Sequence, residues 1–481
     1  MSNAKKILIA GAIALCFFAA LEALYPAASL SRAMGNAHRG SARDETTSDS
    51  ALSGGAATVF NASQDAFAKP LANLPIKDLR KFAFGNKMFN TNWVQAPASV
   101  ASLDGLGPTF NRVSCSSCHF KDGRGHTPAH PDDPMESMLV RLSVPGETDA
   151  GAPMPHPAYG GQLNPMGIKG VPGEGRASVS YTEKTGAYAD GAEYRLRVPH
   201  YTFVDMRFGE LGEGVMFSPR VSPAVHGLGL LESAPEEDIL AWADPDDEDG
   251  DGISGRPNYA ADATGKKRLG RFGWKANVPD LKTQDAGAAL GDIGVTSSLH
   301  PVNNCPDPQT ACKNATNGGD PEMSDEQLEK LTFYSRTLAP PARRDVDDET
   351  VREGAALFTA TGCASCHRPT MKTGKNDEIP ALSDQEIQPF TDMLLHDMGK
   401  ELSDGRPDFD AGGEEWRTPP LWGIGLTKTV NRHTEFLHDG RARNLEEAIL
   451  WHGGEGEKAK EKFVRLSKEK RRALIRFLDS L

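Results

Sequence analysis

Two stretches of the chain, Cys115-Ser-Ser-Cys118-His119 and Cys363-Ala-Ser-Cys366-His367, carry residue types at a spacing that could hold a redox cofactor. Both have the form C-x-x-C-H, the attachment motif for c-type haem. Two thiols one helical turn apart can form thioethers with the two vinyl groups of a porphyrin, and the adjacent histidine becomes the proximal iron ligand. The motifs use four of the seven cysteines. The sequence therefore predicts two covalently bound haem c groups.

A structural zinc site is the alternative use of two C-x-x-C pairs. Zinc ribbons usually place their pairs about 15–20 residues apart, whereas most of the chain separates these two pairs. Predicted export also favours haem c, which is attached outside the bacterial cytoplasm. Residues 1–6 are basic, residues 7–25 are apolar apart from Glu22, and small residues follow. We predict a signal peptide over residues 1–33 and a periplasmic location, with an uncleaved anchor or a lipidated Cys16 as alternatives.

Composition limits the partners and the fold. A net charge of −13 argues against nucleic acid as a partner, and no second apolar run is long enough to span a membrane after signal cleavage. Residues 34–69 are assigned to a disordered tether, because residues 31–57 are rich in Ser, Ala, Gly and Asp. The 49 glycines and 33 prolines predict long loops within a mainly α fold.

Three matched pairs of segments indicate two homologous halves. Gly and Phe precede each haem motif at the same spacing, as Gly85/Phe89 and Gly354/Phe358. Residues 222–230 match residues 418–426, and a terminal helix begins at an N-cap candidate in each half, Ser324 and Ser467. We predict two cytochrome c-like haem domains, residues 70–340 and 341–481, divided at Pro340-Pro341. A Gly/Pro-rich insertion with short β segments, such as residues 194–198, enlarges the first domain.

Further segments resemble the bacterial diheme oxidoreductase family, whose members are often labelled thiol oxidoreductases. The segments that carry the resemblance are Asp104-Gly-Leu-Gly107, Lys121-Asp-Gly-Arg-Gly125, Tyr159-Gly-Gly-Gln-Leu163, Asp249-Gly-Asp-Gly-Ile-Ser-Gly-Arg256, Gly270-Arg-Phe-Gly-Trp-Lys275, Leu394-Leu-His-Asp-Met-Gly399 and Phe436-Leu-His-Asp-Gly-Arg441. That family is similar in turn to diheme cytochrome c peroxidases and to the diheme enzymes that mature a tryptophan-derived quinone. The resemblance covers nearly all of residues 70–481.

His452 is the candidate axial ligand of the second haem. It closes an apolar helical stripe that starts after the N-cap candidate Asn444. A histidine in this position is usually a core residue. However, the segment resembles the one that supplies the methionine ligand of the C-terminal haem in the peroxidases, and His452 stands in place of that methionine. His396 and Met398 are the competing ligands.

The resemblance also suggests catalytic residues at the first haem. Trp274 and Gln284 have the spacing of the peroxidase tryptophan between the haems and the glutamine over the open iron, although Trp274 could equally be a core residue. Asp292 stands two residues away from the expected acid–base glutamate. Glu213, between Gly212 and Gly214, replaces the expected distal histidine. His126 and His130 are more typical of loop histidines, and His226, which aligns with Trp422, of a packing residue.

Two further features could bind a metal ion or form a disulfide. Asp247, Asp249 and Asp251 alternate with small residues as in calcium loops, and the peroxidases of similar fold bind calcium between their domains, but an acidic solvated turn is equally consistent with the pattern. Cys305 and Cys312 are predicted to form a disulfide, with a redox-active pair as the alternative.

Together, these features predict an exported diheme c-type cytochrome oxidoreductase of peroxidase type. Electrons would pass from a soluble cytochrome or cupredoxin to the C-terminal haem, then to the N-terminal haem, and finally to peroxide or a similar small oxidant. A diheme electron carrier without catalysis, and an oxidase of a protein or thiol substrate, are the alternatives.

Overall fold

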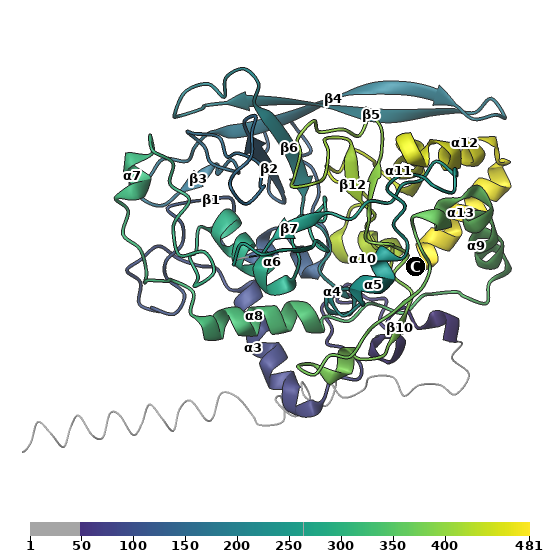
Figure 1. Ribbon diagram of the computed structural model, residues 1–481, viewed down its shortest axis with the longest axis horizontal. Helices are drawn as coiled ribbons and strands as arrows, with labels where there is room; N and C mark the ends of the chain where they lie inside the picture. Colours follow the sequence, from purple (N-terminus) through teal and green to yellow (C-terminus); the bar gives the residue numbers. More distant parts are fainter. Residues whose placement is uncertain (1–48, 263) are drawn as a thin grey trace, which may run out of the picture. The chain divides into compact units, whose positions relative to one another are not determined.

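A computed structural model describes residues 49–262 and 264–481 of the protein (Figure 1). The predicted signal peptide and residues 34–48 of the predicted tether lie outside the described residues. The described residues belong to one unit. No helix among the described residues is long and apolar enough to cross a bilayer.

The helices of the described residues are short, and loops connect most of them. The α-helices are α3 (Leu79–Asn90), α4 (Leu228–Glu232), α5 (Glu236–Leu240), α6 (Leu281–Ala288), α7 (Thr310–Lys313), α8 (Asp325–Thr337), α9 (Glu349–Thr361), α10 (Thr427–Asn431), α11 (Leu445–Leu450), α12 (Glu457–Arg465) and α13 (Lys468–Ser480). A π-helical turn, η6 (Ala289–Ile293), continues α6.

The strands form small antiparallel pairs. They are β1 (Thr109–Phe110) with β3 (Met166–Gly167), β2 (Met138–Ser143) with β6 (Met216–Val221), β4 (Arg176–Ala187) with β5 (Glu193–Val204), β7 (Tyr259–Ala261) with β8 (Lys267–Leu269), β9 (Met371–Lys372) with β10 (Glu386–Ile387), and β11 (Leu395–Asp397) with β12 (Glu415–Arg417). Helix accounts for 29% of the structure and strand for 17%, so the predicted mainly α class is confirmed only in part.

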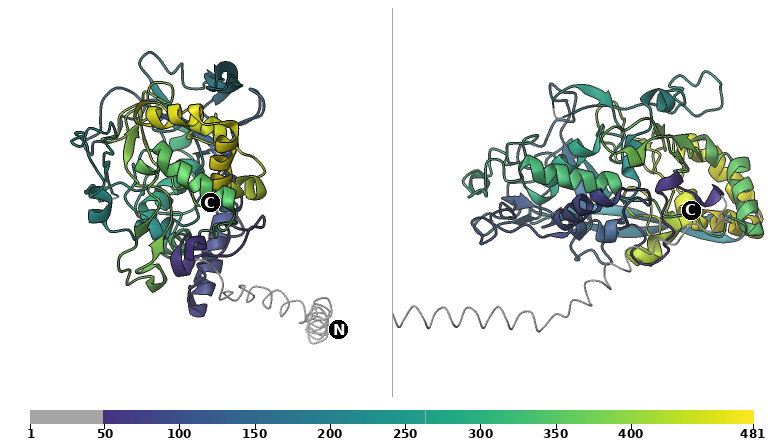
Figure 2. Two further views of the ribbon diagram at one scale, coloured as in Figure 1. Left: turned by 90° about the vertical axis from the view of Figure 1, so that its right-hand side faces the viewer. Right: turned by 90° about the horizontal axis from the view of Figure 1, so that it is seen from below.

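The two halves repeat one helix crossing (Figures 1 and 2). α3 packs against α8, and α9 packs against α13. A Cβ atom at Gly85 would lie 2.2 Å from the Lys330 carbonyl oxygen, and one at Gly354 would lie 2.1 Å from that of Ala473. Only glycine allows backbones to approach this closely. Each crossing is therefore set by the glycine that precedes its C-x-x-C-H motif.

The ends of the repeated helices also follow the sequence. The Ser324 hydroxyl accepts a hydrogen bond from the Gln327 backbone N–H, the Gln327 side chain bonds back to the Ser324 N–H, and the capping box is complete. Ser467 accepts from the Lys470 N–H without that reciprocal bond. Both N-caps are thus confirmed, because side-chain capping depends only on neighbouring residues.

The third repeat brings the two halves into contact with each other. Gly227 and Gly423 both have left-handed backbones, with φ of 77° and 73°. A Cβ at Gly227 would meet the ring of Trp422, and one at Gly423 would meet the ring of His226. The His226 Nε2–H donates to the Trp422 carbonyl at 3.2 Å. His226 is a packing residue, as predicted, and the two matched segments face one another.

The insertion in the first half contains the longest strands. β4 and β5 each have 12 residues and form the hairpin along the top of Figure 1. The hairpin reaches residues of the second half: Tyr188 packs against Phe463, and Glu183 pairs with Arg443. The sequence analysis therefore underestimated the length of these strands. Cross-strand pairing extends well beyond the apolar run at residues 194–198.

Residues 49–69 differ from the predicted tether. Ala57, Ala66 and Phe67 are buried, and the Ser53 hydroxyl donates to the Pro341 carbonyl oxygen. A Cβ at Gly54 would lie 2.5 Å from Pro340. The small residues that suggested disorder instead allow this segment to lie close against the chain around residue 340.

Candidate functional site

A cavity of about 430 Å³ lies beside the first C-x-x-C-H motif. Cys115, Cys118 and His119 line it, together with side chains from β2, β6, α6 and α8. The volume falls within the usual range for cofactor pockets, roughly 300–1,000 Å³. Burial raises the pKa of Cys115 and raises that of Cys118 to about 12. Both cysteines therefore line the cavity as neutral thiols. These residues fit a porphyrin joined to the chain through both sulfur atoms.

His119 is held in one orientation by the backbone. Its Nδ1–H donates to the Pro223 carbonyl at 2.7 Å, immediately after β6. The neighbouring Ser222 hydroxyl donates to the Cys118 carbonyl at 2.7 Å and fixes the motif to the same segment. Because Nδ1 carries the proton, Nε2 has a free lone pair for a metal ion. His119 is therefore suited to the role of proximal ligand.

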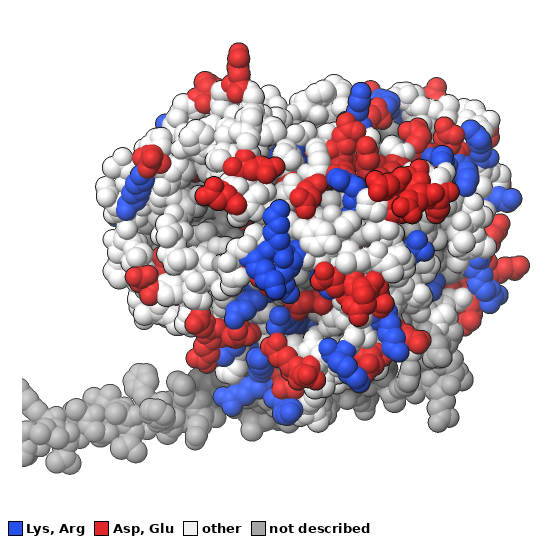
Figure 3. Space-filling view, viewed as in Figure 1, with Lys and Arg blue, Asp and Glu red and all other residues white. Residues whose placement is uncertain are grey.

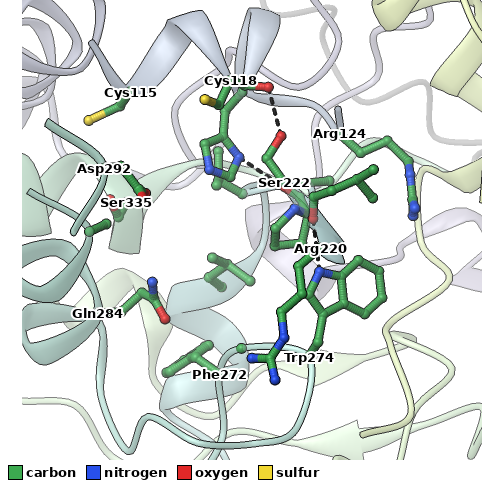
Figure 4. A pocket seen from close by; sticks show the side chains of 18 of the residues that line it. Cys115, Cys118, Arg124, Arg220, Ser222, Phe272, Trp274, Gln284, Asp292 and Ser335 are labelled. Atoms are coloured by element: carbon green, nitrogen blue, oxygen red, sulfur yellow. Dashed lines mark hydrogen bonds between the residues drawn. The ribbon is translucent and has the colours of Figure 1, made fainter. Parts of the chain in front are cut away.

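Three of the four predicted catalytic residues line this cavity: Trp274, Gln284 and Asp292. Cys115 and Cys118 lie on one side of the cavity, while Gln284 and Trp274 lie on the other side (Figure 4). The Trp274 indole N–H donates to the Val221 carbonyl at 2.8 Å. Gln162 donates to the Asp292 carboxylate at 2.8 Å, and the wide turn η6 presents Asp292 to the cavity.

Glu213 is not part of this group. It is exposed in the turn before β6 and does not line the cavity. Gly212 and Gly214 on either side both have positive φ, 82° and 77°, which makes the turn tight and solvent-facing. The Gly-x-Gly pattern thus indicated a turn, and the sequence could not show that the turn faces away from the site.

Asp285 is a cavity residue that the sequence analysis missed. The Ser335 hydroxyl donates to its Oδ1 at 3.2 Å, while its Oδ2 is enclosed without a hydrogen-bond partner among the described residues. Burial raises the pKa of Asp285 to about 7. Its position next to Gln284 on α6 was the only signal in the sequence. A carboxyl group with this pKa can give or take a proton near neutral pH.

The second motif has the same local arrangement. The His367 Nδ1–H donates to the Phe390 carbonyl at 3.0 Å, and Phe390 presents this carbonyl from a left-handed backbone with φ of 56°. The His452 Nδ1–H donates to the Ala448 carbonyl at 2.8 Å, one turn back on α11. Burial and the nearby His452 lower the pKa of His367 to about 4, and burial lowers that of His452. Two neutral imidazoles with free Nε2 atoms therefore lie near each other.

His396 is bonded at both ring nitrogens. Its Nε2 lies 2.9 Å from Asp392 and its Nδ1 lies 2.6 Å from Glu455. Burial opposes protonation, but hydrogen bonds to Asp392, Cys366 and Glu455 outweigh it and raise the pKa of His396 well above its ordinary value. An imidazolium that donates a hydrogen bond from each ring nitrogen has no lone pair to offer to iron. Met398 packs in apolar clusters.

One buried strand pair connects the two sites. In the β11–β12 ladder, His396 pairs with Trp416 and Leu395 pairs with Arg417. His396 lies 3.5 Å from the Cys366 sulfur at the second motif. Trp416 shares an apolar cluster with Trp274, and the Arg417 N–H donates to the Trp274 carbonyl at 2.9 Å. The path from one motif to the other cavity thus runs through packed, hydrogen-bonded residues.

The remaining predicted sites lie apart from the cavity. Asp247 and Asp249 cluster with Asp244, rather than with Asp251, with carboxylate oxygens within 4.8 Å of one another. His126 and His130 do not line the cavity. Cys305 and Cys312 form a disulfide, which confirms that prediction. Among the described residues, no group of metal-ligand side chains combines cysteines from the two C-x-x-C pairs, as a shared zinc site would need.

Two histidine-bearing C-x-x-C-H sites joined through one buried ladder are the arrangement of a di-haem redox protein. The chain belongs to the family described as "Di-haem oxidoreductase, putative peroxidase", whose profile matches residues 47–481. The family resemblance seen in the sequence is thereby confirmed, and membership implies two haem groups. No match was found among curated proteins.

Proposed function

We propose that the protein is an exported, periplasmic di-haem c-type cytochrome oxidoreductase that reduces peroxide or a similar small oxidant. Residues 70–340 and 341–481 would each form a cytochrome c-like domain with one haem. Cys115 and Cys118 would attach the first haem, and Cys363 and Cys366 the second. The observation that carries the proposal is the inequality of the two sites. His367 has a second neutral imidazole nearby, whereas His119 faces a cavity lined by Trp274, Gln284 and Asp292.

His452 is the proposed second ligand of the C-terminal haem iron. His119, His367 and His452 share one feature: a backbone carbonyl accepts the Nδ1–H of each and leaves Nε2 free. His396 lacks this feature because both its nitrogens face carboxylates. Histidine in place of methionine would lower the reduction potential of that haem.

The haem of the first cavity would supply an iron centre for single-electron transfer and for binding the oxidant. The chain's own residues would handle orientation and protons. Gln284 would orient the oxidant through its amide. Peroxide reduction takes up two protons and two electrons and yields two waters, and Asp285 or Asp292 would transfer those protons within the cavity.

Electrons would come from a soluble cytochrome or cupredoxin to the C-terminal haem and continue to the N-terminal haem. Trp274 is the proposed connection, since it lines the first cavity and shares a cluster with Trp416 of the β11–β12 ladder. Basic and acidic side chains are interspersed on the face shown in Figure 3, so a donor that docks on this face would meet mixed charge. Calcium bound at Asp244, Asp247 and Asp249 remains a further prediction, and Asp251 lies outside that cluster.

The direct test combines a haem count with optical and EPR spectra. A pyridine-haemochrome assay on denatured, washed protein should count two covalent haems. One haem should be high-spin or weakly held at its sixth position, and the other low-spin with two histidine ligands. Reduced protein should be reoxidised by peroxide. Two low-spin, six-coordinate haems in every redox state, with no response to peroxide, would instead identify an electron carrier.

A further inference from the structure

A cluster of cations, all buried except the partly exposed Arg141, lies at the first cavity. Arg141 and Arg220 extend from the paired strands β2 and β6 and line the cavity. Arg220 reaches away from Cys115 and Cys118 toward Trp274 and Phe272 (Figure 4). Its guanidinium pairs with Asp408 at 2.9 Å, and both side chains are only 6% exposed. A loop of the second half, residues 404–413, supplies the carboxylates of this cluster.

The cluster has more positive than negative charge. Asp408 also pairs with Arg406 at 3.2 Å, and Asp404 pairs with the fully buried Lys275 at 2.9 Å. Four cations, with Arg141 included, therefore share two carboxylates, which leaves an excess of two positive charges. Asp292, which is bonded to Gln162, has the strongest charge interaction with Arg141, and counting it leaves an excess of one.

The side chain of Arg141, a residue that lines the same cavity, has no hydrogen-bond or ion-pair partner among the described residues. Burial lowers the pKa of Arg141, Asp292 and Asp408 oppose this effect, and Arg220 adds to it. Buried charges are costly unless they are paired. Because positive charge exceeds negative charge in the cluster, a further anion beside Arg141 and Arg220 would be stabilised there.

We propose that Arg141 and Arg220 bind the two propionate carboxylates of the first haem. The inference rests on the proposed function, because it requires a haem joined to Cys115 and Cys118. In a porphyrin of this type the vinyl-derived edge and the propionate edge are opposite each other. Attachment at the cysteines therefore directs the propionates toward the far end of the cavity, where Arg220 lies (Figure 4), and Arg141 is close enough to Arg220 to interact with it. Two carboxylates would offset the excess positive charge, which is one with Asp292 counted and two without it.

This assignment gives the cluster a second effect. A positive charge beside a haem stabilises the reduced state, which carries one negative charge more than the oxidised state. Arg141 and Arg220 would therefore raise the reduction potential of the first haem, and Asp408 would couple that potential to the loop of the second half. Arg141 is thus a positioning residue that also tunes the acceptor haem.

The test is a redox titration of the holoprotein, followed at each haem by optical and EPR signals, after the haem count has confirmed two haems. Arg141→Gln should lower the potential of the first haem and leave the second unchanged, and Arg141→Lys should restore most of the shift. Arg141→Met is the second neutral variant if the glutamine variant does not fold. Arg471→Gln is the control, because Arg471 is buried but pairs with Asp190 outside the cavity.

A formate titration separates haem propionates from a free carboxylate ligand. If the propionates occupy the cluster, formate should not change the spectrum of the first haem through Arg141. A saturable formate response in the wild type that disappears in Arg141→Gln would show that the cluster binds free carboxylates, and would overturn the proposal. An unchanged potential in both neutral variants would also overturn it. Neither result depends on turnover, so the peroxidase proposal is judged separately by spin state and peroxide response.

Discussion

Asp285 should control the response of the first cavity to pH, and the change that tests this is Asp285→Asn. Burial raises the pKa of Asp285 from its ordinary 3.8 to about 7, a shift of about three units. Each unit corresponds to about 1.36 kcal/mol, so the native state favours the neutral carboxyl by roughly 4 kcal/mol. The side chain is partly accessible from the cavity, which reduces the expected effect to about 2–4 kcal/mol.

The sign follows from proton binding. Between about pH 4 and pH 7 the native state holds a proton on Asp285 that the unfolded state has lost, so wild-type stability from this group falls as the pH rises through that window. Asparagine cannot ionise. Asp285→Asn should therefore match the wild type near pH 4 and become more stable than it above pH 7. The groups that face Asp285 are Thr332 and Ser335 of α8, with the Glu232–Arg336 pair behind them.

Urea unfolding of both proteins at pH 4.5 and pH 8 measures this difference. Asp307→Asn is the control, because a hydrogen bond from Lys313 lowers the pKa of that exposed carboxyl, and its removal should bring no gain at pH 8. In the functional assay, the peroxide reaction of the wild type should change with a pKa near 7. Asp285→Asn should remove that inflection and slow the reaction by roughly 10²-fold or more. Identical pH profiles for stability and for rate in the two proteins would refute the reasoning.

Three further predictions address the other sites. His452→Ala should convert one low-spin haem to high-spin, as read by EPR, because His396 is already bonded at both nitrogens; an unchanged spectrum would assign the ligand to His396 or Met398. Trp274→Phe should leave peroxide binding intact but slow electron transfer between the haems in stopped-flow experiments, since it removes the indole that donates to Val221. An unchanged rate would exclude Trp274 from the path. Removal of calcium by a chelator should lower the melting temperature if Asp244, Asp247 and Asp249 hold an ion that offsets their repulsion. No change in melting, with no calcium found by elemental analysis, would leave a solvated acidic turn.

Local patterns predicted the elements that depend on neighbouring residues. The N-caps at Ser324 and Ser467 follow from one hydroxyl and the next turn of backbone. Gly85 and Gly354 marked the helix crossings, because a missing Cβ is needed wherever two helices approach this closely. The C-x-x-C-H spacing similarly located both motifs. The N-caps and the motifs involve only a few neighbouring residues, whereas each glycine contacts a distant helix and was recognised because the same pattern precedes both motifs.

The sequence could not show contacts between distant segments. Asp285 acquires its raised pKa only because α8 packs over α6, and Arg220 pairs with Asp408 only because a loop of the other half reaches β6. Glu213 illustrates the opposite error. Its position between two glycines matched the stretch that carries the distal histidine in the peroxidases, but the two left-handed glycines direct this turn toward solvent. Composition also misled at residues 49–69, where small residues serve close packing rather than disorder.

The duplicated architecture explains how one chain can build two chemically different sites. Three features recur in both halves: the helix crossing, the hydrogen bond from histidine to a backbone carbonyl, and an aromatic ring beside each histidine. The ring centroids of Phe89 and His119 are 6.1 Å apart, and those of Phe358 and His367 are 6.3 Å apart. The differences come from segments outside that repeat. Helix α11 brings His452 toward His367, whereas α6 and the β2–β6 pair surround the first cavity with Gln284, Asp285 and Arg141. Because β11–β12 packs between the sites, a change at His396 or Trp416 should alter communication between the haems without removing either attachment.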